Sequence, residues 1–200
     1  MRRTKEQAIE TREKLLDAAL DVFLAKGYSA ATLQDIADFA NLTRGAVYWH
    51  FKGKEDIYRE LYERVHRLDM AVFDGVADLD LAPFEKLREL VHAIVRNIYL
   101  NERYSDYLEL TTFKIEYSEF EAINREKTDT YGYAVAVMES LAQGAIEEGV
   151  IADKVPPAQV AKTLLLFIIG VCRLKFTAPD LYATADDTLA IVDNYLDSLT

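Results

Sequence analysis

The chain has very little of several things that would mark other classes of protein. Of its 200 residues only one is cysteine, Cys172, so an internal disulfide framework is excluded and a reducing compartment is expected. The longest apolar run, 164–172, is far shorter than the roughly 20 residues that span a bilayer. The N-terminal segment MRRTKEQAIETREK lacks the apolar stretch of a secretory signal. We therefore expect a soluble cytoplasmic protein with no membrane segment.

Proline and glycine are also scarce, with four and eight residues, too few for a fold rich in tight β-turns. Half of the residues are hydrophobic, and they recur at the three- and four-residue spacing of helices. The pattern predicts an all-α fold of about nine helices. The first helix is closed by Lys26-Gly27, and two short helices capped by Thr32 and Thr43 follow it. Beyond them we expect helices near 52–74, 83–102, 119–148, 157–176 and 185–199, a further short helix near 105–113, and a loop over 75–83.

Charge is distributed unevenly along the chain. The net charge is −11, yet residues 1–60 hold 10 basic and 10 acidic side chains, so the whole excess lies in the following 140 residues. An acidic body would be repelled by phosphate and would leave the neutral N-terminal part to face nucleic acid. Acidic surfaces are also common in soluble bacterial proteins, and this plainer explanation stays open.

The segment between residues 32 and 51 has the pattern of a helix-turn-helix. Thr32 and Asp35 are spaced as a capping box, and Thr43 is placed to cap the next helix. Between the two helices Asn41 occupies the tight turn, where a residue that tolerates positive φ is needed. Two short helices joined by such a turn, with a longer helix before them, form the tri-helical DNA-binding motif.

The second helix of this pair carries three consecutive residues, Tyr48, Trp49 and His50, that cannot all face one core. Some of them must be exposed, which favours a binding face. In the major groove Arg44 could pair with guanine, while Gly45 and Ala46 would leave room for thymine methyl groups. Phosphates would be contacted by Tyr48, His50 and Lys54 and by a basic N-terminal arm. The residues expected to contact DNA are Arg3, Thr32, Leu33, Thr43, Arg44, Gly45, Ala46, Tyr48, Trp49, His50 and Lys54.

The run TREKLLDAALDVFLAKGYSAATLQDIADFANLTRGAVYWHFKGKEDIY closely resembles the signature of the TetR family of repressors. Within it, TRGAVYWHF and the RRTKEQA leader are similar to the AcrR-like branch, which represses multidrug efflux pumps. Weaker similarity continues in the body at the segments FKIEY and FTAP and at Gly170. The chain departs from the branch at Asn41, where glycine is usual, and at Phe113, Ile115 and Tyr117. These last departures bear on which ligand is bound.

The resemblance implies a DNA-binding domain over residues 1–54, linked by a helix near 52–74 to a ligand-binding and dimerisation domain over 55–200. It implies a homodimer on a palindromic operator, joined through its last two helices and released by a hydrophobic or amphipathic small-molecule inducer. The helix over 157–176 supports this independently, because it is apolar on several faces and must be covered on all of them. Candidate pocket residues, from apolar stripes and nearby polar groups, are His66, Leu87, Leu90, Val91, Ile94, Thr112, Phe113, Glu116, Tyr131, Ala134, Met138, Leu165, Ile168 and Cys172.

Other functions remain as alternatives. No HExxH, Walker, GxGxxG or GxSxG motif is present, and the three histidines lack metal-site spacing with Cys172, so we expect no enzyme, no cofactor and no metal. The body could instead be a protein-interaction module without a small-molecule site. Control of lipid or catabolic genes rather than efflux, and activation rather than repression, also stay open.

Overall fold

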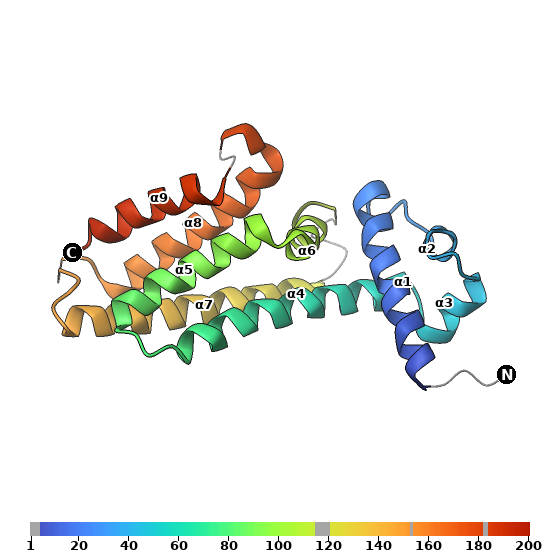
Figure 1. Cartoon of the computed structure of the whole chain (residues 1–200), viewed down its shortest axis with the longest axis horizontal. Helices are drawn as coiled ribbons and strands as arrows, with labels where there is room; N and C mark the ends of the chain where they lie inside the picture. Colours follow the sequence, from blue (N-terminus) through green and yellow to red (C-terminus); the bar gives the residue numbers. More distant parts are fainter. Residues whose placement is uncertain (1–4, 115–120, 153, 182–183) are drawn as a thin grey trace. The chain divides into compact units, whose positions relative to one another are not determined.

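A computed structural model describes residues 5–114, 121–152, 154–181 and 184–200, and all of its regular structure is helical (Figure 1). This confirms the predicted all-α class. The elements are α1 (Lys5–Lys26), α2 (Leu33–Phe39), α3 (Arg44–His50), α4 (Lys54–Ala77), α5 (Pro83–Leu100), α6 (Glu102–Phe113), α7 (Glu121–Glu147), α8 (Pro157–Thr177), the 3₁₀ turn η2 (Pro179–Leu181) and α9 (Ala185–Asp197).

The chain divides into two compact units, which we name the head unit and the body unit. The head unit comprises Met1–Val65 and Asp106–Ile123, and the body unit comprises His66–Ser105 and Asn124–Thr200. The division falls within α4, α6 and α7, so each of these helices contributes to both units. This division by internal contacts does not test the predicted boundary between a DNA-binding domain over 1–54 and a ligand-binding domain over 55–200, which stays a prediction.

Several helix ends follow directly from their sequence. Gly27 and Gly149 have φ of 78° and 75°, the left-handed conformation that glycine adopts freely just beyond a helix. Proline occupies the first turn of α5 and of α8, where its missing N–H costs nothing. The loop expected over 75–83 begins later than predicted, because α4 continues to Ala77. The reason is packing: Val76 is 6% exposed and belongs to the body core, which outweighs the roughly 1 kcal/mol helix cost of Gly75.

In the head unit α1 packs on α2, and α2 on α3. Two ion pairs join α1 to the first turns of α4, one between Arg12 and Glu60 and one between Arg64 Nη2 and Glu13 Oε2 at 2.6 Å. The interior of this unit is apolar and tightly packed. Its fully buried side chains include Leu15, Leu16, Leu20, Phe23, Ile36, Val47, Ile57 and Leu61.

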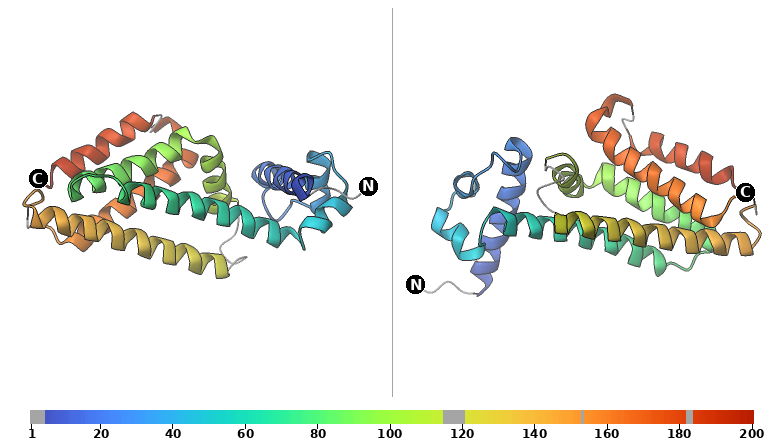
Figure 2. Two further views of the ribbon diagram at one scale, coloured as in Figure 1. Left: turned by 60° about the horizontal axis from the view of Figure 1, so that its bottom comes forward. Right: turned by 180° about the vertical axis from the view of Figure 1, so that it is seen from behind.

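In the body unit α5 packs against both α8 and α9, and the three helices lie side by side in every view (Figures 1 and 2). One apolar cluster fills the space among α4, α5, α7, α8 and α9. No helix in the described ranges is both long and apolar enough to cross a membrane.

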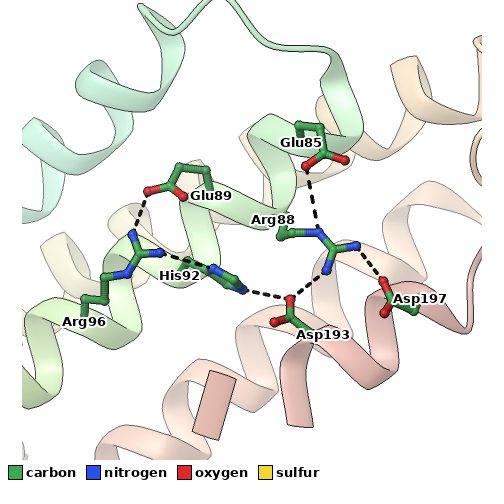
Figure 3. A network of polar contacts seen from close by, with 7 residues as sticks. All are labelled: Glu85, Arg88, Glu89, His92, Arg96, Asp193 and Asp197. Carbon is green, nitrogen blue, oxygen red and sulfur yellow. Dashed lines mark hydrogen bonds and ion pairs between the residues drawn. The ribbon is translucent and has the colours of Figure 1, made fainter. Parts of the chain in front are cut away.

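A network of charged side chains fixes α9 on α5 (Figure 3). Arg88 reaches across to two carboxylates of α9, with Nη1 2.8 Å from Asp193 Oδ1 and Nη2 2.6 Å from Asp197 Oδ1. His92 Nε2 lies 2.8 Å from the same Asp193 oxygen, and Arg96 extends the chain to Glu89. Because these groups are partly exposed, each pair contributes little alone, and the shared partners make the arrangement specific.

Candidate nucleic-acid interface and ligand site

The ends of α2 and α3 are fixed by the side chains that the sequence predicted. Thr32 Oγ1 accepts a hydrogen bond from the Asp35 amide at 3.1 Å, and Asp35 Oδ2 accepts one from the Thr32 amide at 2.9 Å, which confirms the capping box. The pKa of the Asp35 carboxyl is lowered from 3.8 to about 2. The largest cause is the hydrogen bond from Lys26 at 2.7 Å, followed by the hydrogen bonds from Thr32. Thr43 caps α3 through the Ala46 amide at 3.2 Å.

The turn between α2 and α3 is as tight as expected. Asn41 has a φ of 52°, in the left-handed region, and it is the one non-glycine residue with positive φ in the described ranges. Asparagine tolerates this conformation better than other side chains with a Cβ atom. The departure from glycine at this position therefore leaves the turn intact.

Two large side chains of α3 are exposed on the surface and are not packed in the core of the head unit. Val47 is fully buried and holds α3 to the head core, while Tyr48 is 51% exposed and Trp49 is 68% exposed. Arg44 Nη2 donates to Tyr48 Oη at 3.1 Å, and its guanidinium lies 5.4 Å from the centre of that ring. The guanidinium is thus held on the exposed surface of the helix in a defined position.

The remaining predicted DNA contacts lie on or near this surface. Gly45, Thr32 and Thr43 are exposed, whereas Leu33 and Ala46 are half-buried. The half-buried His50 packs edge-on against Trp49, with ring centres 4.4 Å apart. Arg3 lies outside the described residues. The DNA-contacting role of all of these residues stays a prediction.

Lys54, at the first position of α4, has a different environment from the one expected of a phosphate contact. Its Nζ donates to three backbone carbonyls of the corner between α1 and α2, at 2.5 Å to Tyr28, 3.1 Å to Ser29 and 2.9 Å to Ala31. The ammonium also lies 4.4 Å from the centre of the Tyr28 ring. An ammonium has three donors, so these carbonyls use all of them. A phosphate would have to compete with these bonds.

Most of the predicted apolar pocket residues belong to the packed core of the body unit. Leu87, Leu90, Val91 and Met138 are fully buried and Ala134 is 6% exposed. Ile94 and Ile168 pack against this cluster, and Leu165 is half-buried. Core packing explains these apolar stripes without a ligand, so their role as pocket lining stays a prediction. Thr112 and Phe113 belong to the head unit, and Glu116 lies outside the described residues.

The other three predicted pocket residues belong to a polar cluster in the body unit, which sequence reasoning found only in part. The hydroxyl of Tyr104 on α6 donates to Asp69 Oδ1 on α4 at 2.6 Å. Thr130 on α7 lies 3.3 Å from Nδ1 of His66 on α4. We name this group the polar cluster; its members are His66, Asp69, Tyr104, Lys127, Thr130, Tyr131 and Cys172.

A signal for Asp69 was present in the sequence. Val65, Phe73 and Val76 mark the inward stripe of α4, and Asp69 occupies the same stripe at a spacing of four residues. A carboxylate on an apolar stripe is uncommon and indicates a partner or a ligand. Tyr104 and Lys127 carry no comparable signal, because nothing local shows that they face α4 or α8.

Among the described residues, no three or more histidine, cysteine, aspartate or glutamate side chains are grouped to hold a metal ion.

Comparison with known proteins decides the family. Residues 15–61 match the model of the family described as bacterial regulatory proteins, tetR family. Over 98% of its length the chain is 30% identical to the probable acrEF/envCD operon repressor of Escherichia coli K12, of which it covers 89%. The chain belongs to the TetR family. It is a helix-turn-helix DNA-binding transcriptional repressor, and the head unit contains the matched segment.

Two solved TetR-family structures are similar over nearly the whole chain. NalD, described as the secondary repressor of the MexAB-OprM multidrug efflux pump in Pseudomonas aeruginosa, superposes with a TM-score of 0.80 at 24% identity, covering 96% of each chain. SmeT, solved in complex with triclosan, superposes with a TM-score of 0.73 at 27% identity, covering 91% of each chain. The helical body is thus the fold of this TetR-family group.

Proposed function

We propose that this TetR-family protein binds a palindromic operator as a homodimer, represses a multidrug efflux operon and is released by a hydrophobic or amphipathic small molecule. The observation that carries the proposal is the exposed surface of α3, where Tyr48 and Trp49 are more than half exposed beside a pre-positioned Arg44. The efflux assignment is supported by the 30% identical relative, named for the acrEF/envCD operon. Release by a ligand is supported by the likeness to SmeT, whose structure contains triclosan.

The chemistry of α3 suits the major groove. A guanidinium donates two parallel hydrogen bonds to the O6 and N7 atoms of guanine, and the Tyr48 ring limits the rotamers that Arg44 must give up on binding. At Gly45 an added Cβ would meet only Thr43 Oγ1, at 3.8 Å, so this side of the helix is open to a base edge. Tyr48 and Trp49 supply hydroxyl and ring N–H donors for phosphates.

Dimerisation is supported by the outer faces of α8 and α9. Leu166 is 71% exposed and Ile191 is 41% exposed, although both are large and apolar. They border a shallow groove of about 250 Å³, whose lining residues are Leu166, Phe167, Gly170, Val171, Leu174, Thr188 and Ile191. A knob beside a groove on one patch is what a two-fold interface needs, because the same patch must complement itself.

The charges at the edges of this patch fit the same arrangement. The two charged residues of the exposed stripe of α8 are Lys162 and Arg173, both basic, and they flank the exposed Leu166 and Ile169. The exposed residues of α9 include Asp186, Asp187 and Asp197, so that helix is acidic. In a second copy, α8 of one subunit would therefore find an acidic α9 to pack against.

Operator binding and release are tested with labelled DNA from upstream of the protein's own gene, at fixed salt, followed by fluorescence anisotropy. We expect saturable binding that unlabelled random DNA does not displace, and quenching of Trp49, which is the sole tryptophan. Triclosan and the neutral probe N-phenyl-1-naphthylamine are then added at increasing concentration. If operator binding is weakened by neither of these compounds nor by a panel of efflux substrates, the proposed release by a ligand is contradicted.

The dimer is tested by sedimentation of the variant Leu166→Glu. A charge in the centre of the patch should give a monomer and should remove operator binding, because one head contacts only one half-site. Leu100→Glu is the matched control, since Leu100 is equally exposed, at 71%, but lies at the end of α5. A dimeric Leu166→Glu variant would overturn the assignment of this face.

A further inference from the structure

The corner between α5 and α6 is held by a charged side chain of α8. Lys175 lies in the last turn of α8, and its Nζ donates to the carbonyl oxygen of Ile98 and, at 2.7 Å, to Oγ of Ser105. Ile98 belongs to the last turn of α5, and Ser105 belongs to the first turn of α6. One ammonium therefore joins the ends of three helices, and all three residues belong to the body unit.

The surroundings of Lys175 fix the position of its charge. The side chain is half-buried, and Nζ lies 5.4 Å from the ring centre of Tyr99 and 5.6 Å from that of Phe176, within the range of a cation–π attraction. An ammonium that has lost part of its water is costly unless its donors are bonded. The last carbonyls of a helix have no partner inside that helix, so the carbonyl of Ile98 is a suitable acceptor.

The neighbouring helix α9 contacts the same corner. Thr188, which is fully buried, donates from Oγ1 to the hydroxyl oxygen of Tyr99 at 3.1 Å. Tyr99 directly follows Ile98, so the bonds from α8 and α9 act on adjacent residues of α5. Thr188 also lines the groove beside Leu166 and Ile191, in the patch proposed for the dimer interface. Each of the two helices of that patch therefore gives one polar side chain to the end of α5.

The first turn of α6 is also connected to α4. Tyr104 directly precedes Ser105, and its hydroxyl donates to Oδ1 of Asp69 on α4 at 2.6 Å. The side chain of Asn101, just before α6, accepts a hydrogen bond from the Tyr104 amide at 3.1 Å and caps this turn. Tyr104 and Ser105 are 4% and 8% exposed. Because a buried, closely packed turn transmits strain, a displacement of Ser105 should also move Tyr104 and its partner on α4.

The helix α4 continues this connection towards the DNA-binding motif. It is one helix from Lys54 to Ala77, and it begins shortly after α3 ends at His50. In a dimer, the separation of the two recognition helices decides which spacing of half-sites fits both of them. Side chains that restrain α4 near Asp69 should therefore affect the spacing at which both heads bind.

We propose that Lys175 is a positioning residue that couples the dimer face of α8 and α9 to α4, through the first turn of α6, and so determines how strictly the dimer selects the spacing of its half-sites. The inference rests on the proposed binding of an operator by a homodimer. Without the ammonium, α8 and α9 keep their apolar patch, so the dimer should still form. Each α4 would be less restrained, and the two heads should accept half-sites at more than one separation.

The test compares operators that differ only in spacing. The operator found in the DNA upstream of the protein's own gene is made with zero, one or two base pairs inserted at its centre. Each added base pair moves the half-sites apart by about 3.4 Å and turns one relative to the other by about 35°. The original protein should bind the unaltered operator about tenfold or more tighter than the version with two added base pairs, and in Lys175→Met this ratio should fall below about threefold.

Further variants assign the effect to the hydrogen bonds of the ammonium. Lys175→Arg keeps the charge and the donors and should keep most of the spacing preference. Ser105→Ala removes one acceptor and should give an intermediate ratio. Lys154→Met, which removes an exposed charge from the segment between α7 and α8, is the control and should behave as the original protein. Sedimentation establishes that each variant is a dimer, and circular dichroism establishes that it is folded.

Two results would overturn the inference directly. One is a Lys175→Met dimer with the original spacing preference, and the other is an original protein that has no such preference. Equal weakening on all three operators counts as the first result, because a purely structural loss lowers the affinity for every operator by the same factor.

The inference stays testable if Lys175→Met does not fold. Ser105→Ala and Tyr104→Phe then interrupt the same connection, and an unchanged spacing preference in both contradicts it. The proposed function is checked by the original protein alone. If that protein does not bind its operator as a dimer, the proposed function and the inference both fail; if it does and the variants keep its spacing preference, only the inference fails.

Discussion

The head unit and the body unit use polar side chains in different ways. In the head, Thr32, Asp35 and Thr43 bond to backbone groups three residues away, so each one acts within its own turn of helix. In the body, Asp69 bonds to Tyr104, 35 positions later in the chain, and Arg88 bonds to Asp193, 105 positions later. Local polar contacts fix the shape of the DNA-binding surface, whereas distant ones create the environment of a candidate ligand site.

The same contrast applies to the apolar residues. Apart from Ile9 on α1, the large exposed apolar side chains in the described part of the head lie on α2 and α3, the two helices of the motif, with Trp49 68% and Phe39 57% exposed. In the body the stripes expected to line a pocket are mostly buried in the core. In the described part of the body the exposed apolar side chains are spread over several elements, and Leu166, Ile169 and Ile191 on α8 and α9 are among them.

The largest expected effect on stability comes from shortening a side chain in the core of the body. Leu90 was predicted to line a pocket, and it lies in that core. Leu90→Ala should lower the free energy of unfolding by about 2–5 kcal/mol, because Leu90 is fully buried and its removal leaves a void. Chemical denaturation measures the change. Leu100→Ala, at an exposed site on the same helix, is the control and should have almost no effect. A loss below about 1 kcal/mol would show that the site is open, as a pocket wall would be.

The next effect separates binding from folding in the head. Arg44→Ala should weaken specific operator binding by about 1–3 kcal/mol, through the lost contact with guanine, and should leave thermal stability nearly unchanged. Anisotropy titrations with operator and random DNA measure the specificity ratio. Lys14→Ala removes an exposed charge from α1 and is the control. Equal losses on operator and random DNA would indicate that Arg44 contacts phosphate and not a base.

How much of each region the sequence could predict depends on how far apart along the chain the contacting residues lie. The capping box and the positive φ of Asn41 were both predicted, because each depends on residues within a few positions. The extension of α4 past Gly75 was missed, since it depends on core contacts of Val76 with distant helices. Tyr104 and Lys127 were missed for the same reason: periodicity identifies an inward stripe but not what faces it.

A smaller effect on stability tests the role of Lys54, which either holds the corner between α1 and α2 through its hydrogen bonds or contacts a DNA phosphate. Lys54→Met should lower the free energy of unfolding by about 1–2 kcal/mol, because three carbonyls lose their donor. Operator affinity should fall, but the slope of its logarithm against the logarithm of salt concentration should not change. A phosphate contact would instead reduce that slope by about 1. Lys52→Met, at an exposed neighbour, is the control for lost charge.

The smallest effect concerns the local contacts that distinguish the head. Thr32→Ala should cost about 1 kcal/mol of stability, the usual contribution of a helix cap. The contribution of the Asp35 carboxylate to the same cap depends on pH. The folded pKa of Asp35, about 2, lies below the ordinary 3.8, so the stabilisation is complete above about pH 4 and is lost as the pH falls towards 2. Asp35→Asn should therefore be less stable than the original at pH 6, and the difference should shrink at pH 2.5. A difference that does not depend on pH would mean that the carboxylate charge contributes nothing and that the cap acts through its neutral hydrogen bonds alone.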